Sequence, residues 1–281
     1  MSFKYRTYLI CTALTWPAWS LMFFVLLRRS RSIESGGTKA LIIILGGLIL
    51  SLLINLVIVV FSKNVRNQNA IMSELETNGY SDKLRELLEE EIERLGNKTI
   101  NRVYIDYVFK LTNVYLTHRR PQDALYCINR LDIEGLKRHI DIKKDTDRTI
   151  LWVYFCMQMS ICEELGDVNR AHNVFADARP YLDQYSGKGN ITDAIALEVY
   201  SIYYRILGQY EQSIMCAEQM ISQKNRLAKV DGYLLKGYTL ALLGDFEQAD
   251  TYVHEAFEQA KSKAEMDIVD SMRGKINDLK I

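Results

Sequence analysis

A pattern of small, bulky and turn-forming residues recurs along the C-terminal two thirds of this sequence, and this pattern restricts the fold more than any other feature. In its last copy, at residues 233–256, apolar and small residues alternate at spacings of three and four around a central glycine. Such spacings place side chains on one face of a helix, and the glycine marks a turn. The copy therefore predicts two antiparallel helices that approach closely at their small residues. Its eight positions are Tyr233, Gly237, Leu240, Gly244, Phe246, Ala249, Val253 and Ala256.

Earlier copies of the pattern follow in the same register. The turn glycines Gly208 and Gly244 are 36 residues apart, and Gly166 precedes Gly208 by 42 residues. The surplus falls in the segment SGKGN at 186–190, which we predict to be a flexible insertion. The two copies occupy Leu197, Ser201, Tyr204, Gly208, Tyr210, Ser213, Ala217 and Met220, and Phe155, Met159, Cys162, Gly166, Val168, Ala171, Phe175 and Ala178.

A weaker copy comes first, and in it Arg119 stands where a turn glycine is expected. Residues 78–95 match only the second helix of a further, incomplete copy. Over residues 66–262 the pattern resembles the tetratricopeptide repeat (TPR) family, whose units are helical hairpins that stack because one unit cannot bury its own apolar face. The weaker copy occupies Val108, Thr112, Tyr115, Pro121, Ala124, Ile128 and Leu131.

The resemblance implies an all-α fold: a TPR-like α-solenoid of about four helical-hairpin repeats. We assign this repeat domain to residues 101–281, with a C-terminal capping helix over Lys261–Ile281, and juxtamembrane helices with a partial repeat to residues 63–100. An irregular helical bundle without the superhelix is the alternative.

In this family the first helix of each repeat lines a concave groove, so the resemblance also implies candidate partner-binding residues. Asn113 matches a position used by members that clamp a peptide carboxylate, but Phe109 replaces the lysine of that clamp. We therefore expect an amphipathic helix or an extended peptide as the ligand; alternatively, some of these side chains pack under a neighbouring helix. The candidates are Phe109, Asn113, Val153, Ser160, Glu163, Glu198, Ile202, Arg205, Asp231, Leu234 and Tyr238.

Two long uncharged runs precede the repeats. Thr7–Leu27 has 21 residues and Ala40–Ser62 has 23, and either is long enough for a helix that crosses a hydrocarbon core of about 30 Å. We predict a transmembrane hairpin over residues 1–62, with helices at about 7–27 and 40–62 and a loop at 28–39. A cleaved signal peptide is the alternative for the first run.

Gly47, Ser51 and Asn55 are spaced four residues apart in the second run and so share one helix face. Small and polar residues at this spacing support close helix packing in lipid. We interpret them as packing against the first helix, or alternatively as contacts in a homodimer or a membrane complex.

The sequence predicts a two-pass integral membrane protein. The basic cluster RRSRS at 28–32 favours a cytoplasmic loop, which would place the repeats outside. Apparently unpaired cysteines in the repeat region favour a reducing compartment, and on that ground we favour a cytoplasmic repeat domain.

No motif for catalysis, a metal or a cofactor is found. None of the four histidines stands at a ligand spacing, and no phosphate-binding loop or nucleophile elbow occurs. The five cysteines, Cys11, Cys127, Cys156, Cys162 and Cys216, fit small buried hydrophobes. The region after residue 62 is mildly acidic, which gives no electrostatic reason to expect nucleic acid.

These observations predict a protein that is not an enzyme, carries no cofactor and binds a protein partner. The first hypothesis is a membrane-anchored scaffold or adaptor that binds a peptide or helix in its groove while its hairpin contacts the lipid bilayer. The second is a non-catalytic subunit or assembly factor of an integral membrane complex, which would dock through the hairpin.

Overall fold

The computed structural model describes residues 17, 21, 45–56, 63–96, 101–139, 145–182 and 191–280. Every regular element in these ranges is a helix. The chain divides into two compact units, Met1–Met72 and Ser73–Ile281. The division falls inside α3 (Lys63–Asn78).

The predicted transmembrane hairpin is corrected by the structure. No helix in the described ranges is long and apolar enough to cross a membrane. In the second predicted span residues 45–56 are helical, whereas the first span and the loop lie outside the described residues except for Pro17 and Leu21. A span needs about 20 predominantly apolar helical residues, and no helix among the described residues meets this requirement. The predictions of a two-pass integral membrane protein and of a membrane-anchored fold are therefore wrong.

Gly47, Ser51 and Asn55 do share one face of the helix at residues 45–56. All three are buried, and the side-chain amide of Asn55 donates a hydrogen bond to Ser51 Oγ at 3.2 Å. Leu45 and Ile49 are exposed on the same helix. The three residues therefore share one face of the helix. The interpretation of this face as a packing surface inside a membrane depended on the predicted hairpin and does not hold without it.

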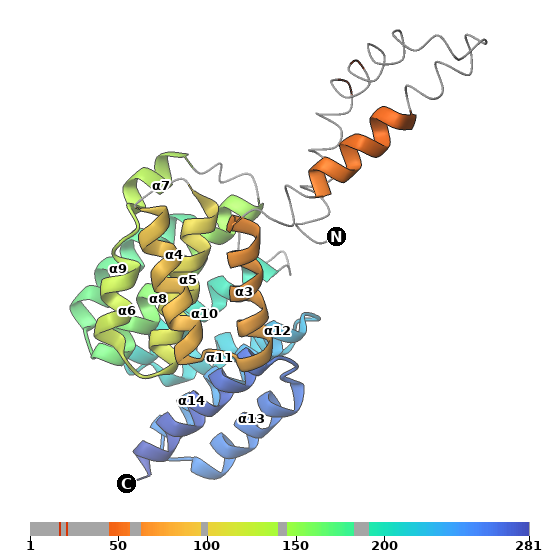
Figure 1. The fold of residues 1–281 in the computed structure, drawn as a ribbon. Helices are drawn as coiled ribbons and strands as arrows, with labels where there is room; N and C mark the ends of the chain where they lie inside the picture. The colour runs from red at the N-terminus through yellow and green to blue at the C-terminus, as the bar shows by residue number, and fades with distance from the viewer. Residues whose placement is uncertain are drawn as a thin grey trace, which may run out of the picture. The chain divides into compact units, whose positions relative to one another are not determined.

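The second unit is a series of helical hairpins (Figure 1). It begins with the end of α3 and with α4 (Asp82–Leu95), whose first turn is capped by the Ser81 hydroxyl. A short helix, α7 (Ile133–His139), separates the first hairpin from the second, and α14 (Lys263–Leu279) ends the chain. The four hairpins are α5 (Arg102–Thr117) with α6 (Pro121–Ile128), α8 (Asp145–Leu165) with α9 (Val168–Leu182), α10 (Ile191–Ile206) with α11 (Tyr210–Ile221), and α12 (Arg226–Leu242) with α13 (Phe246–Gln259).

The four hairpin turns have one geometry. Gly166, Gly208 and Gly244 have φ angles of 64°, 70° and 85°, in the left-handed region that glycine adopts at low cost. Arg119 has a φ of 60° at the matching position of the first hairpin. In each turn the following amide donates to a carbonyl five residues back, as Arg120 does to Tyr115 at 2.8 Å. Arg119 therefore forms the same helix-ending turn as the three glycines.

Small residues let neighbouring helices approach, as the sequence predicted. A Cβ at Gly237 would lie 3.1 Å from the Ala249 carbonyl oxygen and 3.3 Å from Val253 Cγ2. Where the small residues are hydroxyls, they bond to one another: Ser213 Oγ lies 2.9 Å from Ser201 Oγ and 3.1 Å from Thr239 Oγ1. These hydroxyl contacts form one buried row that joins α10, α11 and α12.

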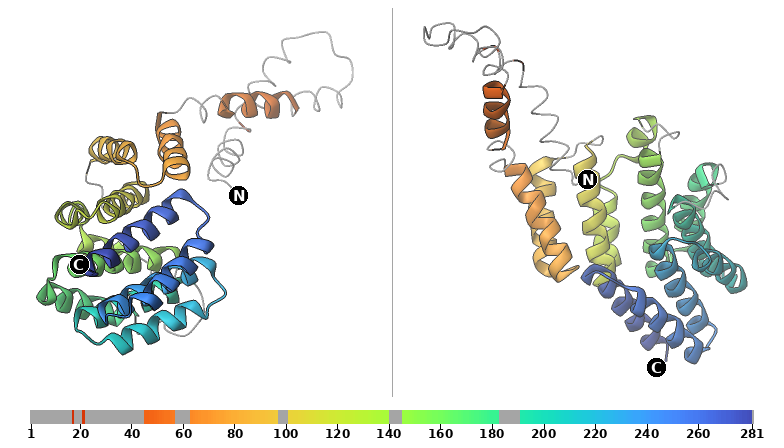
Figure 2. Two further views of the ribbon diagram at one scale, coloured as in Figure 1. Left: turned by 90° about the horizontal axis from the view of Figure 1, so that it is seen from below. Right: turned by 90° about the vertical axis from the view of Figure 1, so that its right-hand side faces the viewer.

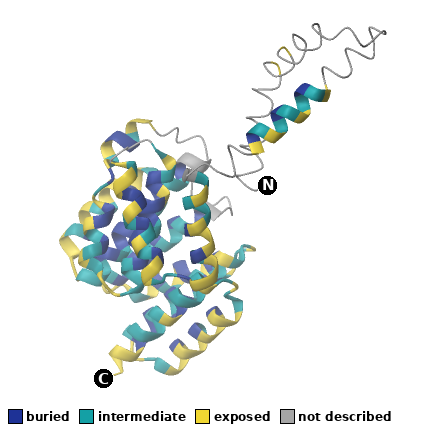
Figure 3. Cartoon of the chain, viewed as in Figure 1, coloured by how far each residue is buried: buried dark blue, intermediate teal, exposed yellow. Residues whose placement is uncertain are grey.

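The first helix of a hairpin is more deeply buried than the second. In α12 nine residues are buried, against three in α13, and α5 has eight against three in α6. Figure 3 shows this burial along the helices of the second unit. The solenoid-like arrangement therefore has an inner layer made of α5, α8, α10 and α12. Four of the cysteines, Cys127, Cys156, Cys162 and Cys216, are buried and free, whereas Cys11 lies outside the described residues.

The C-terminal helix does more than cap the last hairpin. Val269 and Ile276 of α14 join the apolar core formed with α12 and α13, as a cap would. The opposite side of α14 reaches the first hairpins, however, because Ser271 Oγ donates to the Thr117 carbonyl oxygen at 3.1 Å. Both views in Figure 2 show α14 beside α5.

Candidate functional site

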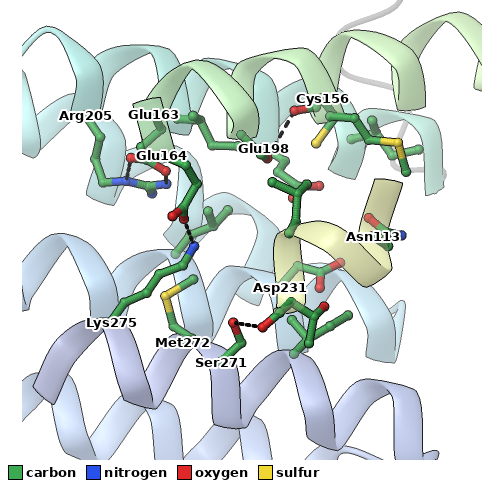
Figure 4. Close-up of a pocket in the computed structure, with 18 of the residues that line it drawn as sticks. Asn113, Cys156, Glu163, Glu164, Glu198, Arg205, Asp231, Ser271, Met272 and Lys275 are labelled. Carbon is green, nitrogen blue, oxygen red and sulfur yellow. Dashed lines mark hydrogen bonds and ion pairs between the residues drawn. The ribbon is translucent and has the colours of Figure 1, made fainter. Parts of the chain in front are cut away.

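A cavity of about 280 Å³ lies between the inner helices and α14. It is lined by α5, α8, α10 and α12 on one side and by α14 on the other (Figure 4). The structure brings together at this cavity eight of the eleven predicted groove residues, namely Asn113, Val153, Ser160, Glu163, Glu198, Ile202, Arg205 and Asp231.

The other three predicted residues lie elsewhere. Phe109 is 9% exposed and Leu234 is 3% exposed, and Leu234 belongs to the apolar core with α13 and α14. Tyr238 lies next to the cavity lining, with the guanidinium carbon of Arg205 5.3 Å from its ring centroid. The alternative that some groove positions pack under a neighbouring helix therefore holds for Phe109 and Leu234.

A buried ion pair forms one end of the cavity. Arg205 Nε and Nη2 donate to the two carboxylate oxygens of Glu163 at 2.7 and 2.8 Å, which is the two-point geometry of a strong arginine–carboxylate pair. Burial lowers the pKa of Arg205, but the charge and the hydrogen bonds of Glu163, together with the nearby Tyr238 and Glu198, outweigh this effect, and the pKa of Arg205 is raised. This pair joins α8 to α10 and fixes the position of both side chains.

Two further carboxylates, Glu198 and Asp231, face the cavity, as Figure 4 shows. Burial raises the pKa of Glu198, while the thiol of Cys156 and the charge of Arg205 act in the opposite direction. Burial and the charge of Glu198 together hold the pKa of Asp231 well above its ordinary value. Removal from water and mutual repulsion disfavour both charged forms, and a nearby cation would favour them.

The cavity is acidic overall. Its lining holds four carboxylates, from Glu163, Glu164, Glu198 and Asp231, but only two basic side chains, from Arg205 and Lys275. Each of these two is already paired, Arg205 with Glu163 and Lys275 with Glu164. The arrangement can accept a polar or cationic group next to apolar surface.

The contribution of α14 to the cavity was not predicted from the sequence. Ile268, Ser271, Met272 and Lys275 complete the lining, and Lys275 reaches Glu164 across the cavity (Figure 4). A signal was present, because polar residues recur every four positions in this helix on a face distinct from that of Val269 and Ile276. A simple end cap needs only one buried face, so the second patterned face indicated a second contact.

Comparisons with protein-family models, with curated proteins and with solved structures gave no match.

Proposed function

We propose that this protein is a non-catalytic interaction module that binds a peptide or a helix of a partner protein on the inner surface formed by α5, α8, α10 and α12. The observation that carries the proposal is the cavity on this surface, which gathers side chains from all four hairpins. Stacked helical hairpins use such surfaces for protein recognition, and membership of the TPR family is part of the proposal.

The chemistry of the surface supports a mixed apolar and polar ligand. Val153 and Ile202 provide apolar contact area, while Ser160, Glu198 and Asp231 provide polar groups between them. A surface of this composition suits an amphipathic segment, which presents apolar anchors and a few polar groups at fixed spacing. The excess of carboxylates favours a segment that carries basic residues.

Photo-crosslinking of the full chain in its native cell tests this proposal. A benzophenone side chain would replace Ser160 or Asn113 on the inner surface, and Glu255, which is exposed on α13, would be the control position. We expect one partner segment to crosslink at both inner positions and not at the control. Adducts that form equally at all three positions, or at the control alone, would contradict the proposal. Circular dichroism would verify that all three variants fold.

A further inference from the structure

We propose that the surface of α5 and α8 beneath α14 is the docking site of a partner helix, and that α14 is its resident occupant. The partner would carry a polar stripe with the spacing of the α14 stripe and would displace this face of α14 on binding. This inference rests on the proposed function and names its ligand.

The stripe on α14 is regular. Asp267, Ser271 and Lys275 follow one another every four residues and Asp278 follows three later, so all four lie on one face of the helix. Asp267 Oδ2 accepts a hydrogen bond from the Tyr80 amide at 2.8 Å.

The other three residues of the stripe reach α5 and α8 and the turn after α5. Ser271 donates to the Thr117 carbonyl oxygen at 3.1 Å, Lys275 pairs with Glu164, and Asp278 pairs with Arg119. The stripe thus reads as carboxylate, hydroxyl, ammonium and carboxylate.

Two of the receiving groups, the Thr117 carbonyl and the Tyr80 amide, are backbone groups at a helix end and a turn. Thr117 is the last residue of α5, where carbonyl oxygens have no amide donor within the helix. Tyr80 follows Gly79, which has a φ of 66°, and a Cβ at Gly79 would lie 2.0 Å from Asp267 Oδ2. The surface is therefore shaped to receive a helix at close range.

This contact is easier to replace than the one on the other side of α14. Arg119 and Asp278 are about half exposed, and such an exposed ion pair contributes little to stability, whereas the Lys275–Glu164 pair is only 19% and 17% exposed and is the main polar contact to be replaced. Val269 and Ile276, in contrast, are fully buried against the last hairpin. Release of the polar face therefore leaves α14 attached to α13.

The fit of α14 is also incomplete. It leaves the 280 Å³ cavity, and it brings only one cation, Lys275, to a lining that also holds Glu198 and Asp231. A partner helix with a second basic residue one turn before the lysine, in place of Ser271, would fill this space and pair with these carboxylates. The expected partner thus carries carboxylate, lysine or arginine, lysine or arginine, and carboxylate at the spacing of the α14 stripe.

A charge-reversal experiment on the full chain tests the inference. Glu164→Lys repels Lys275, which frees the polar face of α14, and it also reverses the preference of the docking surface. The probes are three fluorescein-labelled peptides: residues 262–281, the same peptide with Lys275→Glu, and the same peptide with Ser271→Lys. Fluorescence anisotropy would measure each Kd. Glu255→Lys on the exposed side of α13 is the matched control variant.

We expect the Glu164→Lys chain to bind the Lys275→Glu peptide about ten-fold more tightly than the unmodified peptide, and the wild-type and Glu255→Lys chains to show the opposite order. The Ser271→Lys peptide should bind the wild-type chain more tightly than the unmodified peptide. Asp231→Asn should abolish this gain.

Equal Kd values for the unmodified and Lys275→Glu peptides in all chains would overturn the inference. Two other results would also overturn it. One is an absence of peptide binding to a Glu164→Lys chain whose α14 amides exchange faster than in wild type. The other is amide hydrogen exchange in α14 that the Glu164→Lys substitution leaves unchanged. Asp278→Arg, which repels Arg119, provides a second loosened chain if Glu164→Lys fails to fold. A partner that crosslinks at Ser160 while these peptides fail would refute only this inference and leave the proposed function standing.

Discussion

The two sides of α14 differ in how they are held. On the side of the last hairpin, Val269 and Ile276 are 0% and 1% exposed, and Arg226 of α12 donates to both oxygens of Glu265 at 2.7 and 2.9 Å. On the side of the first hairpins the contact is polar: it consists of hydrogen bonds, the Arg119–Asp278 ion pair, which is about half exposed, and the Lys275–Glu164 ion pair, which is 19% and 17% exposed. Apolar burial supplies most of the stability of packed helices, whereas exposed ion pairs supply little. The helix is thus firmly attached on one side and weakly on the other.

The largest expected effect comes from the apolar side. Ile276→Ala should lower the free energy of unfolding by about 3 kcal/mol, because it removes buried apolar contacts and leaves a cavity in the core shared with α12 and α13. Urea denaturation of the full chain would measure it. Ser271→Ala on the polar side is the matched control and should cost less than about 1 kcal/mol. Equal losses of unfolding free energy in Ile276→Ala and Ser271→Ala would contradict the proposed difference between the two sides of α14.

The ion pair at the start of α14 should have the next largest effect. The hydrogen bonds from Arg226 lower the pKa of Glu265 to about 2 from an ordinary value of 4.5. Its contribution is therefore complete above about pH 4.5 and disappears as the pH falls toward about 2. Glu265→Gln should cost about 2 kcal/mol at pH 7 and flatten the stability profile in that window. A profile with the same slope in both proteins would contradict this assignment.

Backbone strain and steric contact can be separated at two glycines. Gly79 and Gly96 have nearly the same φ, 66° and 65°, but only a Cβ at Gly79 would meet α14, whereas one at Gly96 would have nothing within 4 Å. Gly96→Ala should cost about 1 kcal/mol from strain alone. Gly79→Ala should cost about 1 kcal/mol more, because Asp267 must move away. Equal costs in thermal or urea unfolding would mean that α14 does not rest on this turn.

The smallest effect is expected at the far end of the stripe. A double-mutant cycle with Arg119→Gln and Asp278→Asn should give a coupling energy below about 1 kcal/mol that vanishes in about 1 M NaCl. The same cycle on Arg226 and Glu265 should give a larger coupling that persists in salt, since these side chains are only 31% and 19% exposed. A coupling energy that is larger for Arg119 and Asp278 than for Arg226 and Glu265 would contradict the proposal that α14 is held more weakly on its polar side.

The hairpins and their turns could be predicted from the sequence because they depend on local patterns. Gly237 and Ala249 mark close helix approaches, and Gly166, Gly208 and Gly244 mark left-handed turns. The turn at Arg119 was less predictable, because a residue with a Cβ rarely adopts this conformation.

The site was predictable only on one side. Positions on the inner helices follow the repeat register, so eight candidates lie at the cavity. The residues of α14 reach partners such as Tyr80 and Thr117, which are 187 and 154 positions away in the chain, and no local spacing encodes such contacts. The membrane prediction failed because an uncharged run meets a length criterion, while no described helix is both long and apolar enough.

Hydrogen exchange of the full chain tests most directly whether the inner surface is closed by a weak polar contact. The Tyr80 amide reports on the contact because it donates to Asp267. When NaCl rises from about 0.05 M to about 1 M, we predict faster exchange at Tyr80, while amides of α12 and α13 keep their rates. Exchange at Tyr80 that stays as slow as in α12 at both salt concentrations would contradict the account.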